Sequence, residues 1–150
     1  MNNLLRRIKS AFPFVGTRAA TEDDLFEFCA DHNIELIFTP EARAGIYVVF
    51  GGKHHIFLNS QLFGRRLLHV AFHEIGHYLL HVPKRTIARA EFFHKHENAR
   101  THREAEMVAA MLLLPISVME DLLLAGQSEE FDEVAELIGT RIEAYGKFKM

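Results

Sequence analysis

The pentapeptide His73-Glu74-Ile75-Gly76-His77 combines residue types and a spacing that could do chemistry. On an α-helix, His73 and His77 lie one turn apart on the same face, so both imidazoles can bind one metal ion. Glu74 can then take a proton from a metal-bound water as that water attacks a carbonyl carbon. This HExxH pattern predicts the metal-binding helix of a zinc peptidase. The alternative interpretation is a pair of hydrogen-bonded core histidines beside a paired glutamate.

The surrounding sequence places the pentapeptide on a long, buried helix from Arg65 to His81, ended by Pro83. Its apolar residues recur at steps of three and four: Leu67, Leu68, Ala71, Phe72, Ile75, Tyr78 and Leu79. Gly76 in the middle of this helix costs about 1 kcal/mol relative to alanine. It therefore predicts that a neighbouring backbone approaches closely at this point.

Catalytic zinc usually takes three protein ligands and a water, so a third ligand is expected outside the pentapeptide. A second apolar helix is predicted from Thr101 to Leu114. Relative to Ala105 on its apolar side, His102 lies about 60° away, and Glu104 and Glu106 each lie about 100° away on opposite flanks. The direction of the side chains around the helix axis favours His102 as the third metal ligand, with Glu104 as the alternative.

The remaining sequence predicts an α+β fold in a single domain spanning residues 1–150. The expected order is an N-terminal helix, a helix capped by Thr21, a three-stranded antiparallel meander, the HExxH helix and C-terminal helices. The strands are expected at 34–39, 45–50 and 54–59, with a hairpin at Gly51-Gly52-Lys53. After the second long helix, one helix follows Pro115, another runs from Ser128 to Gly139, and a short tail helix ends the chain.

The first twenty residues carry four basic side chains and no acidic one: Arg6, Arg7, Lys9 and Arg18. Leu4, Leu5, Ile8 and Phe12 would share one side of a helix there. This pattern predicts a helix docked on the domain; the alternative is a basic amphipathic helix that contacts a membrane or an acidic partner.

The composition is that of a globular protein with a real core: 150 residues, 49% hydrophobic and 25% charged. A net charge of -3 gives no general reason to expect binding to nucleic acid or membrane. The single cysteine, Cys29, excludes an internal disulfide and is expected in the core. Since no segment resembles a signal peptide or a membrane span, the expected location is the cytoplasm.

Two blocks of sequence carry a family resemblance. HEIGHYLLH (His73 to His81), a polar spacer and REAEMVAAMLLLP (Arg103 to Pro115) resemble the ImmA/IrrE-type metallopeptidases. In that family, HELGHxxLH is followed by E-x-E-A-(N/D)-x-F-A-A-x-L-L-M-P. The resemblance covers roughly residues 34–115. It implies a zincin core in which the first block supplies two histidines and a glutamate, and the second block supplies the third ligand.

The second block departs from the family pattern at one position that matters. Without gaps, the family's leading glutamate falls on His102, its variable glutamate on Glu104 and its Asn/Asp position on Glu106. Three readings stay open: a three-histidine site completed by His102, a site completed by Glu104, or an impaired site. A neutral imidazole is a suitable zinc ligand. The direction of the side chain on the helix and the alignment with the family pattern both favour His102.

The resemblance implies a Zn²⁺-dependent endopeptidase of narrow specificity that cleaves a helix-turn-helix transcriptional repressor of a phage, mobile element or stress regulon. Direct binding to nucleic acid or to a membrane is not expected, and the oligomeric state is left open. The alternative is a non-catalytic, metal-holding module that antagonises a repressor or an antitoxin-like partner by docking alone. Glu74 argues against that alternative, because a structural zinc site closed by four ligands has no use for the carboxylate.

Overall fold

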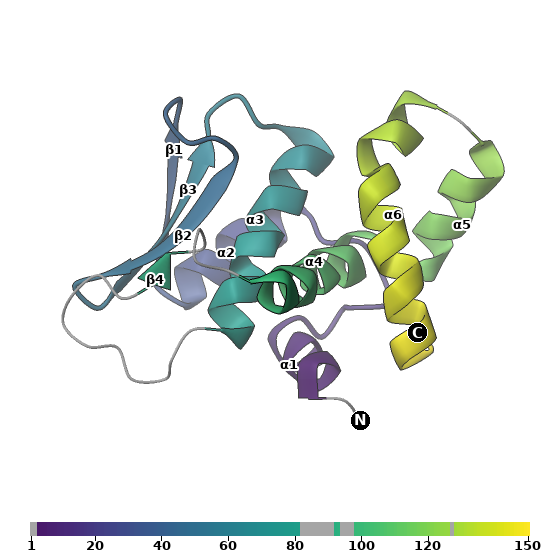
Figure 1. The fold of residues 1–150 in the computed structure, drawn as a ribbon, viewed down its shortest axis with the longest axis horizontal. Coiled ribbons are helices and arrows are strands. Elements are labelled where there is room, and N and C mark those ends of the chain that lie inside the picture. The colour runs from purple at the N-terminus through teal and green to yellow at the C-terminus, as the bar shows by residue number, and fades with distance from the viewer. Residues whose placement is uncertain (1–2, 82–91, 94–97, 127) are drawn as a thin grey trace.

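The computed structural model describes residues 3–81, 92–93, 98–126 and 128–150, and its elements confirm an α+β fold. The helices are α1 (Asn3–Ala11), α2 (Glu22–Asp31), α3 (Gly64–Leu80), α4 (Ala99–Leu113), α5 (Ile116–Ala125) and α6 (Glu129–Phe148). The strands are β1 (Ile34–Thr39), β2 (Gly45–Phe50), β3 (Lys53–Asn59) and β4 (Phe92–Phe93). The sheet lies on one side of α3, while α5 and α6 stand together on the opposite side (Figure 1).

The sheet is mixed, with the strand order β1-β3-β2-β4, so the predicted antiparallel meander is wrong. β2 and β3 are antiparallel as expected, because Gly51 and Gly52 both adopt positive φ angles, 59° and 77°, and close a tight turn. β1, however, pairs parallel with β3, from Ile34 opposite His54 to Thr39 opposite Asn59. The connection from β1 to β2 is longer than a tight turn and does not hold these strands together, so β3 lies between them.

α3 and α4 are the helices that position the candidate site, and they cross in close contact. A Cβ atom on Gly76 would lie 2.9 Å from the Cα atom of Ala105 and 3.1 Å from its carbonyl oxygen. The close backbone approach predicted from Gly76 is therefore confirmed. Gly45 allows β2 to approach α3 closely, because a Cβ atom on Gly45 would lie 2.5 Å from Val70 Cγ1 and 3.3 Å from Glu74 Cγ. Two glycines thus bring α4 and β2 against α3 at its HExxH turn.

The two terminal helices enclose the core from other sides. α1 buries Leu4, Leu5 and Ile8, which confirms the prediction of a docked helix. α6 runs without a break through Gly139, so the expected end at that residue and the separate tail helix are wrong. One glycine costs a helix only about 1 kcal/mol, and the buried face of α6 continues past Gly139 through Arg141 and Ala144.

Local capping explains several helix boundaries. Thr21 and Asp24 form a capping box at the start of α2, and Ser128 Oγ accepts a hydrogen bond from Phe131 N at the start of α6. Asn98 and Thr101 form a second capping box that starts α4 two residues earlier than predicted.

In the described ranges, no single helix is long and apolar enough to cross a bilayer. α4 and α5 meet these criteria only when they are taken together, and this pair is bent by 83°.

Candidate metal centre

The HExxH turn of α3 is buried, as its apolar surroundings predicted. His73, Glu74 and His77 expose 9%, 2% and 0% of their surface. The rings of His73 and His77 lie side by side, with their centroids 5.0 Å apart. Because they project from one helical turn, both imidazoles face the same region, and the carboxylate of Glu74 comes from the residue directly after His73.

Glu106 of α4 joins the site by contacting two histidines of α3. Its Oε1 atom accepts a hydrogen bond from His73 Nδ1 at 2.6 Å, and its carboxylate lies 3.0 and 3.1 Å from His69 Nε2. Burial alone would raise the pKa of Glu106, but the hydrogen bonds from His69 and His73 outweigh it and lower the pKa below its ordinary value. The carboxylate is therefore ionised and holds the proton of His73 on Nδ1.

His77 has a different neighbour. Its Nδ1 atom lies 2.9 Å from Nδ1 of His81, so one of these nitrogens donates a proton and the other accepts it. The other ring nitrogen of His81, Nε2, lies 3.5 Å from Glu104 Oε1. A chain of polar contacts thus leads from the HExxH helix to Glu104 on α4.

The two candidates for the third ligand lie on different sides of the crossing between α3 and α4. His102 is exposed, and its ring centroid is 4.9 Å from that of His73. Glu104 is half-buried and contacts His81 and Arg100. The structure therefore brings His102 next to His73, the first histidine of the motif. It brings Glu104 next to His81, which lies one helical turn after the second histidine. Which of them completes a metal site stays a prediction.

The residues of the HExxH turn fit a metal ion by their donor chemistry. With the proton of His73 held on Nδ1 by Glu106, Nε2 is the nitrogen whose lone pair can bind a metal, and a carboxylate behind a metal-binding histidine is a common arrangement. If His77 Nδ1 donates the proton in its contact with His81 Nδ1, Nε2 of His77 likewise carries the lone pair that can bind a metal. Within the described part of the chain, no three His, Cys, Asp or Glu side chains converge as a metal-holding group.

Glu106 is the residue that the sequence reasoning missed. The sequence places Glu106 on a flank of the second helix and predicts no partner for it. The signal was present, since an acidic residue inside the apolar run from Ala105 to Leu114 must be paired if it is buried. His69, one helical turn before His73 on α3, is one of its partners. Two histidines of the polar spacer between the two sequence blocks, His94 and His96, lie outside the described residues.

Comparison with known proteins identifies the family. Residues 29–147 match the family model of the IrrE N-terminal-like domain, Peptidase_M78, and this match covers well over half of the chain. It contains α3, α4 and all four strands, but not α1. No curated protein and no solved structure matches the chain.

Proposed function

Because the chain belongs to the IrrE N-terminal-like family of metallopeptidases, we propose that it is a zinc-dependent endopeptidase of narrow specificity that cleaves a transcriptional repressor. The observation that carries the proposal is the buried turn of α3. Two histidines and a glutamate lie together there, and Glu106 orients the first histidine at 2.6 Å.

His73 and His77 would hold the metal through Nε2, with His102 or Glu104 as the third ligand. A bound zinc ion would lower the pKa of a water molecule and polarise the carbonyl of the scissile peptide bond. The side chains of the protein would supply the proton transfers. Glu74, enclosed beside β2, takes the proton from the attacking water and then gives it to the nitrogen of the leaving amine.

Glu106 has a supporting role in this proposal. Its ionised carboxylate holds the imidazole of His73 in one orientation and in one tautomer, so the ring need not reorganise when the metal binds. The 2.9 Å contact between His77 Nδ1 and His81 Nδ1 restrains the orientation of the second ring. Both supports come from residues outside the HExxH pentapeptide.

A non-catalytic binding module is the second candidate, and two observations favour it. His102, at the family's usual glutamate position, is exposed, and no three-residue metal group converges in the described ranges. Such a protein would antagonise a repressor or an antitoxin-like partner by docking. It would have no use for Glu74, which is 2% exposed on the same turn as the two histidines.

The test combines metal content with cleavage. The purified protein should bind about one zinc per chain, and the double variant His73→Ala/His77→Ala should bind none. Glu74→Gln should keep zinc and fold but lose cleavage of a co-purifying repressor, because an amide cannot accept the proton of the water. Full zinc occupancy in the double variant would overturn the metal site. Wild-type cleavage by Glu74→Gln would exclude the proposed base.

A further inference from the structure

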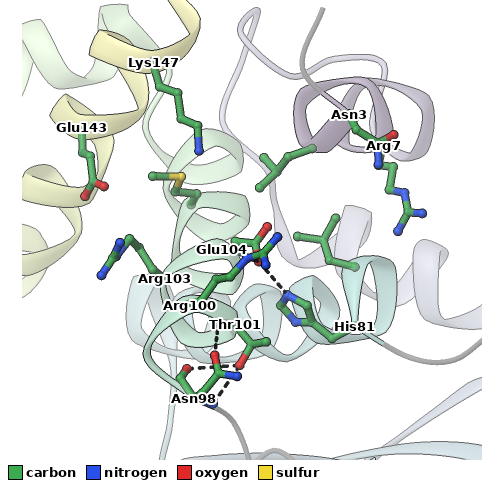
Figure 2. A pocket seen from close by; sticks show the side chains of 13 residues that line it. Asn3, Arg7, His81, Asn98, Arg100, Thr101, Arg103, Glu104, Glu143 and Lys147 are labelled. Carbon is green, nitrogen blue, oxygen red and sulfur yellow. Dashed lines mark hydrogen bonds and ion pairs between the residues drawn. The ribbon is translucent and has the colours of Figure 1, made fainter.

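A cleft opens where α1, the C-terminal end of α3, the first turns of α4 and the C-terminal end of α6 meet (Figure 2). Its volume is about 800 Å³, within the range of ligand-binding sites. One wall is α1, which lies outside the residues that match the family. The cleft is therefore built in part by a helix that lies outside the region matching the family.

The charge of the cleft is opposite to that of the whole chain. Its lining holds four basic side chains, Arg7, Arg100, Arg103 and Lys147, against two acidic ones, Glu104 and Glu143. The chain as a whole carries a net charge of -3. Positive charge is thus concentrated in a concave surface, where it attracts anions more strongly than the same charges spread over a convex surface would.

The four basic groups differ in their existing partners. Arg7 donates a hydrogen bond to the carbonyl of Leu79 at 3.0 Å, and Arg100 Nε lies 3.4 Å from Glu104 Oε1. Arg103 and Lys147 form no ion pair with any residue in the described ranges. In Figure 2, the side chain of Lys147 extends from α6 toward the middle of the cleft. Lys147 and Arg103 are the groups with charge to offer a ligand.

The cleft adjoins the candidate metal centre. His81 lines it, and the Nδ1 atom of His81 lies 2.9 Å from that of His77. Glu104, the alternative third ligand, lines it as well. One side chain, that of His81, therefore separates the cleft from the second histidine of the HExxH motif.

We propose that this cleft binds an Asp- and Glu-rich segment of the protein substrate and so holds that substrate against the metal-binding helix. This inference rests on the proposed peptidase function and names the chemistry of the sequence that the peptidase recognises. The basic groups are spread over three helices and are interrupted by Glu104 and Glu143. Carboxylates at intervals along a peptide can match that pattern, whereas the unbroken phosphates of a nucleic acid would meet both glutamates.

The test is a binding measurement with a fluorescein-labelled hexaglutamate peptide, read by fluorescence anisotropy. The wild-type protein should bind the peptide at low salt and lose most of this binding at high salt. The double charge reversal Arg103→Glu/Lys147→Glu should weaken binding about tenfold or more, since two attractions become repulsions. The matched control is Lys53→Glu/Arg66→Glu, the same charge change at two exposed residues that do not line the cleft. Its binding should stay within about twofold of the wild type.

Three outcomes would overturn the proposal: no binding at low salt, equal binding by the two double variants, or tighter binding of a thymidine oligonucleotide of equal charge. Circular dichroism of both variants verifies that the fold is retained. The result is separate from that of the proposed function, because Glu74→Gln should bind the peptide like the wild type. Glu74-dependent cleavage without peptide binding would refute the cleft alone, and peptide binding with cleavage that survives Glu74→Gln would refute the proposed function alone.

Discussion

Alanine in place of Gly76 should destabilise the protein, whereas alanine in place of Gly139 should stabilise it, although both glycines lie inside helices. In an exposed helix interior, alanine is favoured over glycine by roughly 0.5–1 kcal/mol. Gly139 is exposed on α6, and a Cβ there would meet nothing within 4 Å. The full gain is therefore expected at that position.

At Gly76 the same gain is opposed by a collision. The new Cβ would lie 2.9 Å from Cα, 3.1 Å from the carbonyl oxygen and 3.2 Å from Cβ of Ala105. Two of these atoms belong to the backbone of α4, so the helices must separate, because no side chain can rotate away. Overpacking of this kind typically costs about 1–3 kcal/mol, and the net loss at Gly76 should be about 1–2 kcal/mol.

Urea unfolding followed by circular dichroism measures both effects as shifts of the midpoint. Thermal unfolding should agree, with the melting temperature moving roughly 2–4 °C for each kcal/mol in a chain of this length. Gly76→Ala should also weaken zinc binding, since separation of the helices moves Glu106 away from His73, whereas Gly139→Ala should leave zinc binding unchanged. If Gly76→Ala proved as stable as the wild type, the close packing of α3 against α4 would be refuted.

Three further predictions concern the metal site and the start of α2. His102→Ala should lower zinc affinity far more than Glu104→Ala, and His102→Glu should restore it; the reverse ranking in a zinc titration would make Glu104 the third ligand. Glu106→Gln should lower zinc affinity about tenfold, measured by competition with a chromogenic chelator, because the charge-assisted bond to His73 is lost; an unchanged affinity would contradict this supporting role. The hydrogen bond from Arg18 lowers the pKa of Asp24 from 3.8 to about 2, so this carboxylate stabilises the fold above pH 4 and loses its contribution as the pH falls toward 2. Asp24→Asn should therefore cost about 1 kcal/mol at neutral pH and flatten the acid limb of a stability-against-pH curve; an acid limb like that of the wild type would refute the assignment.

Local patterns in the sequence determined the elements that carry the candidate site. Apolar residues at helical spacing predicted α3 and placed His73, Glu74 and His77 on one buried turn of it. Gly51 and Gly52 predicted the hairpin between β2 and β3, and the structure has both residues at positive φ. Each of these features is set by residues within a few positions of one another, so the sequence contains all the information needed.

Contacts between distant segments needed the tertiary structure. β1 pairs parallel with β3 because the chain connection before β2 permits it, and no local pattern specifies that choice. Glu106 reaches His73 across 33 positions of sequence only because Gly76 lets α4 cross α3 backbone to backbone. Helical spacing gives the direction of a side chain around its own axis but not which helix it meets. The sequence could therefore identify the two histidines, whereas the carboxylate that orients the first of them emerged from the packing of α4 on α3.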